Sequence, residues 1–167
     1  DMGTGCDTVM AQIAADCLNT PMDNIVVFSV DTDISPYDSG SYASSTTYIT
    51  GKAVEMACAK LKTQLCGIAA GMLGCSTEEV VFENGRVKQI NTEKSVSLAE
   101  ISVKDQVNND IAAVATASHS SPVSPPPYMV GMVEIELDKD TGEVKILDYV
   151  AVVDCGITIN PALARIQ

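Results

Sequence analysis

Hydrophobic residues in the first half of the chain recur at two different spacings. Apolar side chains three and four positions apart predict a helix over residues 8–18 and a long helix from about Ser45, which continues or bends near Gly67. Between these helices, residues 25–30 are mostly β-branched or aromatic and predict a strand. The pattern therefore predicts helix, strand and helix in that order.

Turn and capping signals organise the middle of the chain. The dipeptide Asn84-Gly85 predicts a hairpin between residues 80–82 and 87–89, because both residue types tolerate the left-handed backbone of a tight turn. Ser97 stands three positions before Glu100, which is the spacing of a capping box, and predicts the start of a short helix.

Strands are predicted again in the C-terminal part of the chain. Weak alternation predicts a strand over residues 111–117, and the proline-rich residues 118–127 predict a loop. Residues 129–137 and 144–153 are expected to pair as a long hairpin around the turn at residues 138–142. The order of elements predicts an α+β fold, with helices packed on a mixed or antiparallel sheet and a long C-terminal hairpin.

Small and hydroxyl-bearing residues gather where helices begin. Gly3-Thr4-Gly5 precedes the first helix, and residues 40–46, Gly-Ser-Tyr-Ala-Ser-Ser-Thr, open into the long helix. Near the end of the chain, Asn160 and Pro161 suit the N-cap and the first position of a third helix. A helix start leaves N–H groups unpaired and can hold an anion, although ordinary capped helices behind solvated turns account for the same residues.

The ordered set of these segments resembles the molybdopterin-binding subunit of the xanthine dehydrogenase and aldehyde oxidase family. The likeness covers nearly the whole chain: a glycine turn at residues 3–8, an Asp-Thr-Asp step at 31–38, the loop at 40–46, and Asp-Cys-Gly-Ile-Thr-Ile-Asn-Pro at 154–161 followed by Gln167. In this family such segments surround the pterin and its dinucleotide tail. The resemblance implies cofactor contacts for nine residues: Gly3, Thr4, Gly5, Ser41, Ala43, Ser44, Ser45, Thr46 and Gln167.

Three departures from the family pattern are typical of one branch of it. Thr4 replaces a usual amide side chain, Ser45 stands where many members have Arg, and Ile166 replaces a common glycine. The anaerobic nicotinate or purine hydroxylases, whose molybdenum subunit can be split into two polypeptides, are the nearest likeness.

The resemblance also implies an activity and its cofactors. It implies a molybdenum-dependent oxidoreductase that uses molybdopterin cytosine dinucleotide to hydroxylate an N-heterocycle or an aldehyde with oxygen from water. Iron–sulfur clusters and FAD are then expected on partner chains, beside a second molybdopterin subunit. The catalytic glutamate of the family lies downstream of the last motif, so these residues alone are expected to be inactive. A scaffold or interface domain that has lost cofactor binding is the alternative, because Thr4 and Ser45 change the chemistry of the loops.

Length and chain ends predict part of a larger protein. The chain has 167 residues, of which 46% are hydrophobic, and this is enough for a single domain over residues 1–167 with its own core. It begins inside a glycine turn without the strand that should lead into it, and it ends in the first turns of a helix. We therefore expect a partial molybdopterin-binding domain.

Charge and cysteine usage narrow the partners and the compartment. A formal net charge of -12 without any basic run argues against nucleic acid, which is bound through clustered Lys and Arg. Seven acidic residues and no Lys or Arg precede Lys52, so neutral donors would have to hold a phosphate. No apolar run approaches the length of a membrane span. Six cysteines lack the spacing of a metal site, which favours buried thiols in the cytoplasm.

Three other chemical interpretations receive less support. Met2-Gly3-Thr4-Gly5 lacks the third glycine and the preceding strand of a dinucleotide fingerprint. His119 has no nucleophile elbow to serve, and the exposed proline-rich loop accounts for it. The carboxylates of Asp31, Asp33 and Asp38 do not have the spacing of a calcium loop, so solvated or capping roles are favoured.

Overall fold

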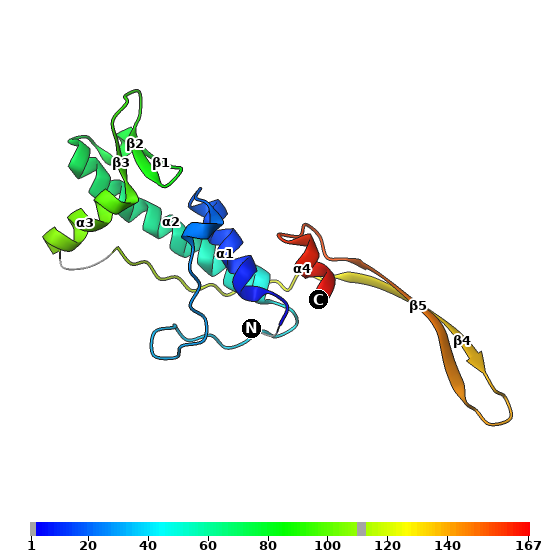
Figure 1. Cartoon of the computed structure of the whole chain (residues 1–167). Helices are drawn as coiled ribbons and strands as arrows, with labels where there is room; N and C mark the ends of the chain where they lie inside the picture. The colour runs from blue at the N-terminus through cyan, green and yellow to red at the C-terminus, as the bar shows by residue number, and fades with distance from the viewer. Residues whose placement is uncertain (1–2, 110–112) are drawn as a thin grey trace.

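The computed structural model describes residues 3–109 and 113–167, and its centre is one long helix (Figure 1). This helix, α2 (Thr46–Leu73), packs along α1 (Cys6–Cys17) and carries α3 (Leu98–Asn109) at its far end. A short helix, α4 (Pro161–Ile166), ends the chain, and single 3₁₀ turns occupy Met22–Asn24 and Thr77–Glu79. The prediction of two N-terminal helices is confirmed, with α1 beginning two residues earlier than expected.

Helix α2 runs through its internal glycines and ends at the next one. Gly67 and Gly71 lie on its exposed side, and the helix continues through both because buried neighbours such as Ala69 and Ala70 hold it against the sheet. Gly74 then adopts a left-handed φ of 72°, and its N–H donates to the Ala70 carbonyl. A left-handed residue after the last turn is the common way to end a helix.

A small antiparallel sheet packs against the C-terminal half of α2. Its order is β1-β2-β3, formed by β1 (Val80–Glu83), β2 (Arg86–Gln89) and β3 (Ser95–Ser97). The predicted hairpin between the first two strands is confirmed. Asn84 and Gly85 have φ values of 50° and 68°, the left-handed pair of a tight hairpin turn.

The main core lies between this sheet, α2 and the start of α3. Ile101 and Val87 are fully buried, and Leu65 and Phe82 pack with them. The predicted capping box at the start of α3 is confirmed, because Glu100 accepts from the Ser97 N–H at 2.7 Å while Ser97 Oγ accepts from the Glu100 N–H at 3.2 Å. Sequence and packing thus agree on α2, on the β1–β2 hairpin and on the start of α3, whereas β3 was not predicted.

Two predicted strands are wrong where the structure describes them. Residues 25–30 form no strand; Val26, Phe28 and Val30 are 77%, 70% and 85% exposed. A strand requires hydrogen bonds from a neighbouring strand, and no described strand lies beside this run. Residues 113–117 are also without strand structure, and 111–112 lie outside the described residues.

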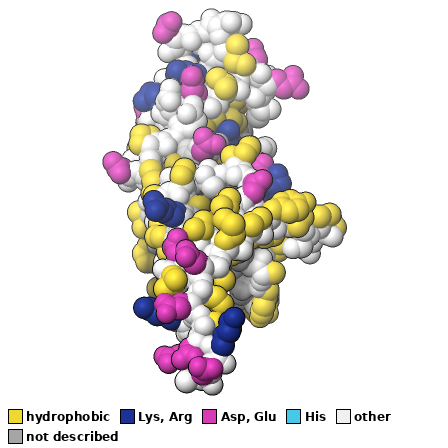
Figure 2. Space-filling view, turned by 90° about the vertical axis from the view of Figure 1, so that its right-hand side faces the viewer, with side chains coloured by type: hydrophobic (Ala, Val, Ile, Leu, Met, Phe, Trp, Pro, Cys, Tyr) yellow, Lys and Arg dark blue, Asp and Glu magenta, His cyan; other side chains and the backbone are white. Residues whose placement is uncertain are grey.

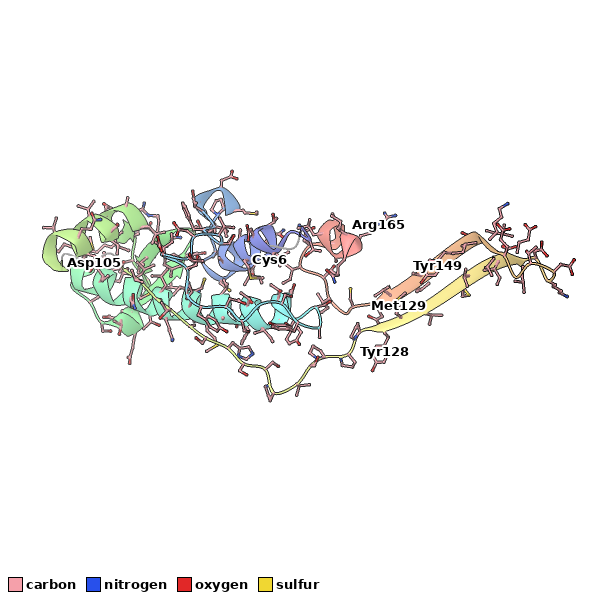
Figure 3. All side chains as sticks on the ribbon, turned by 90° about the horizontal axis from the view of Figure 1, so that it is seen from below. Cys6, Asp105, Tyr128, Met129, Tyr149 and Arg165 are labelled. Carbon is pink, nitrogen blue, oxygen red and sulfur yellow. The ribbon has the colours of Figure 1, made fainter. Side chains whose placement is uncertain are left out.

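The segment at 113–117 runs along α2 instead of joining a sheet. Lys60 Nζ donates to the Thr116 carbonyl at 2.9 Å, and Gln64 Nε2 donates to the Val114 carbonyl at 3.1 Å. Carbonyls that a strand would offer to a neighbour are therefore taken by side chains of a helix. The proline-rich residues that follow lead on to the C-terminal hairpin (Figure 3).

The predicted C-terminal hairpin is confirmed as a two-stranded ribbon that projects away from the helices (Figure 1). It consists of β4 (Tyr128–Leu137) and β5 (Val144–Asp154), antiparallel, with an irregularity between Glu134 and Ile135. Every residue of both strands is exposed. The α+β class is therefore correct, and both described sheets are antiparallel, but the helices pack only on the first of them.

Candidate functional site

Three helix starts that are far apart in sequence meet at one end of the helical body. Helix α4 lies beside the N-terminal end of α1, as the positions of Arg165 and Cys6 show (Figure 3). Asn160 Nδ2 donates to Gln12 Oε1 at 3.1 Å, and Gln167 Nε2 donates to Ser44 Oγ at 3.1 Å. The glycine turn, the hydroxyl loop and the C-terminal motif therefore form one continuous surface.

The glycine turn at the start of α1 is shaped by conformation and by close contact. Gly3 and Gly5 have φ values of 84° and 80°, in the left-handed region that favours glycine. A Cβ on Gly5 would lie 2.6 Å from Leu163 Cδ1, so a side chain there would push α4 away. Thr4, between the two glycines, is half-buried. Gly5 is thus needed for the approach of α4 as well as for the path of the turn, whereas Gly3, where a Cβ would meet no atom within 4 Å, is needed for the path alone.

The hydroxyl loop contains a left-handed turn built without glycine. Ala43 and Ser44 have φ values of 50° and 56°, and the Ser45 N–H closes the turn on the Tyr42 carbonyl at 3.1 Å. Two consecutive left-handed residues with side chains cost about 1–2 kcal/mol each. Such strain in an exposed loop is a feature of binding sites, where it holds the backbone ready for a ligand.

The remaining residues of this loop differ in accessibility. Ser44 is exposed, whereas Ser45 is only 7% exposed and lies beneath the turn. Thr46 Oγ1 donates to Ser41 Oγ, and both residues are half-buried. Of the predicted contact residues in this loop, Ala43 and Ser44 are the ones that face outward.

Of the two helices α1 and α2, α2 has the N-terminus that is better suited to bind an anion. Ser45 makes no side-chain capping bond and the first turn of α2 holds no acidic residue, so its free N–H groups keep their partial positive charge. The first turn of α1 contains Asp7, whose Oδ2 accepts from Ser29 Oγ at 2.9 Å. A carboxylate there already interacts with the helix dipole and repels a second anion.

Neutral donors and one cation therefore define the chemistry of this surface. Neither α1 nor the hydroxyl loop contains Lys or Arg, and α4 adds Arg165, which is exposed. Burial raises the pKa of the Cys6 thiol, with the Asp7 charge adding to the effect, so this cysteine stays protonated near neutral pH. The residues fit an anionic, polar cofactor held by N–H groups and hydroxyls.

Four residues of this assembly were missed as site residues in the sequence. Gln12, Asn160, Leu163 and Arg165 join α1 to α4 or stand beside the contact. Asn160 was predicted only as a helix cap, and this role is confirmed because its Oδ1 accepts from the Leu163 N–H at 3.1 Å. The one sequence signal for Gln12 was a long amide side chain within the otherwise apolar residues 9–15.

Candidate metal ligands do not gather in the part of the chain that is described. No group of three His, Cys, Asp or Glu side chains could hold a metal ion there. Asp31 Oδ1 instead accepts from the Asp33 N–H at 2.9 Å, and Asp38 Oδ1 accepts from the Gly40 N–H at 2.7 Å. These carboxylates cap turns, as favoured from the sequence.

Comparison with known proteins accounts for this arrangement. The model of the molybdopterin cofactor-binding domain family matches residues 1–167. The chain belongs to this family. As a molybdopterin cofactor-binding domain of the xanthine oxidase group, it has the fold that the ordered motifs indicated. No helix among the described residues is long and apolar enough to cross a membrane.

The relatives that this chain matches are much longer than the chain itself. The chain is 33% identical over 165 residues to the probable hypoxanthine oxidase XdhD of Escherichia coli (strain K12), covering 98% of this chain and 17% of that protein. It is 31% identical over 173 residues to the nicotine 6-hydroxylase large subunit of Paenarthrobacter nicotinovorans, covering 99% of this chain and 21% of that subunit. The chain thus spans about a fifth of the length of these relatives.

Solved structures give the same result. Quinoline 2-oxidoreductase from Pseudomonas putida 86 superposes with a TM-score of 0.74 at 27% identity, over 99% of this chain and 22% of that one. CO dehydrogenase from Oligotropha carboxidovorans superposes with a TM-score of 0.76 at 28% identity, over 99% of this chain and 21% of that one.

Proposed function

We propose that this domain holds molybdopterin cytosine dinucleotide in a molybdenum hydroxylase that oxidises an N-heterocycle or an aldehyde. The observation that carries the proposal is the hydrogen bond from Gln167 to Ser44, which joins two motifs 123 residues apart on one surface. The Gly5–Leu163 contact brings the glycine turn to the same surface. Iron–sulfur and flavin centres would lie on partner chains; the names of two relatives, a complex subunit gamma and a large subunit, support the presence of such chains.

The residues of the site have separable tasks in this proposal. The N–H groups at the start of α2 and the Ser44 hydroxyl donate to the phosphates, because the helix start has no side-chain cap and Ser44 beside it is exposed. The Gln167 amide can both donate and accept, which suits a pterin edge. Gly3, Thr4 and Gly5 let the backbone approach the cofactor, while Ser41, Ala43, Ser45 and Thr46 keep the loop in its left-handed turn.

The cofactor supplies the redox chemistry that puts oxygen from water into a C–H bond. The domain supplies binding and orientation, and the catalytic base would come from residues beyond this segment. A second molybdopterin-binding polypeptide and a cytoplasmic location complete the proposal. Six free cysteines among the described residues agree with a reducing compartment.

A negative charge introduced at position 44 tests this function. In the purified holoenzyme, Ser44→Asp should lower molybdenum and cytidine nucleotide content by tenfold or more, because a carboxylate about 4 Å from a phosphate costs about 1–4 kcal/mol. Ser44→Asn is the matched control. Asparagine has the same size as aspartate without its charge, tolerates left-handed φ, and keeps an oxygen for Gln167. Full cofactor content in the Asp variant would remove the phosphate role.

The ribbon favours a second candidate, an interface domain without cofactor. Because paired residues of antiparallel strands share a face, one face of the ribbon is apolar from base to tip. It consists of Met129, Gly131, Val133, Ile135, Leu137, Val144, Ile146, Tyr149, Ala151 and Val153. The opposite face is apolar only near the base, and charged side chains gather at the tip, the lower end in Figure 2.

The size of this apolar face favours a large partner. Two ribbons stacked face to face would bury about 700 Å², less than the roughly 1,200 Å² of stable interfaces. We therefore propose another polypeptide body of the same enzyme as the covering surface. Val133→Lys should then prevent co-purification of the partner subunits, whereas Glu134→Lys, opposite Asp148, should not. Normal subunit stoichiometry in the Val133 variant would exclude this interface, and cofactor analysis of the assembled enzyme separates the two candidates.

A further inference from the structure

We propose that Asn160 and Gln12 form a positioning bridge that sets Gln167 against Ser44. The inference rests on the proposed function, since it concerns the same cofactor surface. Neither residue acts by touching the cofactor. Their role is to fix the direction in which α4 leaves the body of the domain, and therefore where its last residue lies.

Asn160 uses both ends of its amide at the start of α4. Its Oδ1 accepts from the Leu163 N–H at 3.1 Å and caps the helix, while its Nδ2 donates to Gln12 Oε1 at 3.1 Å. The capping bond orders the first turn of α4 but leaves the helix free to tilt. The bond to Gln12 ties that turn to a second helix, which is an additional restraint.

Gln12 gives the bridge a rigid base. It lies in α1 directly after the buried residues Val9, Met10 and Ala11, and Ala15 is buried on the following turn. Helix α1 packs along α2, where Ile13 Cδ1 would lie 2.8 Å from a Cβ on Gly51. A side chain anchored in this packed pair moves little, so it can serve as a reference for α4.

The apolar contact at the same place cannot replace the bridge. Leu163 packs against Gly5 and sets how closely α4 approaches α1. Apolar contact is non-directional, however, and allows α4 to turn about Leu163. The Asn160–Gln12 hydrogen bond is the directional restraint between the two helices.

A small tilt of α4 is enough to break the contact at its end. The seven steps from Asn160 to Gln167 span about 10 Å at helical rise, so a tilt of about 10° at Asn160 moves Gln167 by about 2 Å. The Gln167 Nε2 to Ser44 Oγ distance is 3.1 Å, and a hydrogen bond does not survive a displacement of that size. Loss of the bridge should therefore act at Gln167, seven residues away.

Gln12→Lys separates the bridge from the cap. Lysine at position 12 faces Asn160 Nδ2 with a second donor, while Asn160 Oδ1 still caps the Leu163 N–H. Asn160→Asp alone is the charge control, because aspartate keeps the capping oxygen and Gln12 can turn its amide and donate Nε2 to the second carboxylate oxygen. The double variant Asn160→Asp with Gln12→Lys rebuilds the bridge as an ion pair. A cap-only role predicts no loss in Gln12→Lys, whereas a bridge predicts loss in Gln12→Lys and recovery in the double variant.

The test measures both the cofactor and the helix. In the purified holoenzyme, Gln12→Lys should lower molybdenum content about tenfold, and the double variant should restore it to the level of Asn160→Asp. In the cofactor-free enzyme, hydrogen exchange of the peptide 161–167 should be faster by about tenfold in Gln12→Lys and normal in the double variant, while peptides of α2 stay unchanged. Wild-type content and exchange in Gln12→Lys, or no recovery in the double variant, would overturn the bridge.

Failure of the bridge and failure of the proposed function give different results. If Ser44→Asp loses cofactor but Gln12→Lys does not, the surface binds cofactor and the bridge is absent. If Ser44→Asp keeps full cofactor, the proposed function fails, and the exchange measurement still decides whether the bridge orders α4.

Discussion

Ala43 and Ser44 show how single residues prepare this surface. Both have left-handed backbone conformations that side chains disfavour, yet the turn is held by the Ser45 N–H on the Tyr42 carbonyl and by Gln167 on Ser44. The interactions around the turn therefore offset its strain. A backbone that is already in its binding conformation loses less entropy when the ligand arrives.

Gln167 should contribute to cofactor retention and little to stability. Gln167→Glu removes the donor of the bond to Ser44 and adds charge near the proposed phosphates, so cofactor affinity should fall by about 1–3 kcal/mol. The unfolding free energy should change by less than about 0.5 kcal/mol, because the side chain is exposed. Equilibrium release of cofactor and urea unfolding measure the two quantities.

Gln167→Lys is the matched control for this prediction. Lysine keeps a donor for Ser44 and adds a cation in place of an anion, so the cofactor should be retained at least as well as in the unaltered enzyme. Equal affinity in the Glu and Lys variants would remove Gln167 from the site.

At the scale of elements, α2 carries the hydroxyl loop at its N-terminal end and packs against the small sheet with its C-terminal half. Its 28 residues include Gly67 and Gly71 inside the helix and Gly74 at its end. The two kinds of position make opposite demands on the backbone. A helix interior disfavours glycine because of its entropy, whereas the left-handed end requires it.

Two alanine substitutions should therefore change stability in opposite directions. Gly74→Ala should lower the unfolding free energy by about 1 kcal/mol, because φ is 72° there although the space around it is open. Gly71→Ala should raise it by about 0.5–1 kcal/mol, since a Cβ there meets no atom within 4 Å. Urea unfolding of the two variants checks the prediction, and equal changes in both would contradict the helix end at Gly74.

At the scale of the whole molecule, burial of thiols couples stability to alkaline pH. Burial raises the pKa of the Cys58 and Cys66 thiols, and of Cys6 and Cys17 closer to the N-terminus. The folded protein thus holds these thiols protonated at pH values where the unfolded chain has begun to lose the protons. Their contribution is complete below the unfolded pKa of about 9 and is lost as pH rises through the folded values.

Unfolding by urea at pH 7.5 and at pH 10 should show this loss. The unaltered protein should lose more stability between the two pH values than Cys58→Ala, in which the most buried of the six thiols is absent. Subtracting the stability loss of Cys58→Ala from that of the unaltered protein removes the contribution of lysines and tyrosines, which both proteins share. Identical pH dependence in both would show that the Cys58 thiol titrates alike in the folded and unfolded states.

The local elements followed from the sequence because short-range physics determines them. The capping box at Ser97 and Glu100, the left-handed turn at Asn84-Gly85 and the long ribbon each depend on residues close together in the chain. The glycine turn, the hydroxyl loop and the C-terminal motif indicated the cofactor-binding family as an ordered set, by their resemblance to it, and the family model over residues 1–167 confirms this. The strand expected at residues 25–30 failed because β structure needs a neighbour that local sequence cannot provide.

Tertiary structure alone decided how the motifs meet. Nothing in the spacing of Gln12 and Asn160, or of Ser44 and Gln167, indicates that each pair lies within hydrogen-bonding distance across more than 120 residues. These contacts exist because α1 and α2 pack closely and α4 returns to Gly5 after the ribbon. The sequence by itself therefore determined the parts of the binding surface, whereas long-range packing determined its geometry, because contacts between distant residues depend on how the whole chain is folded.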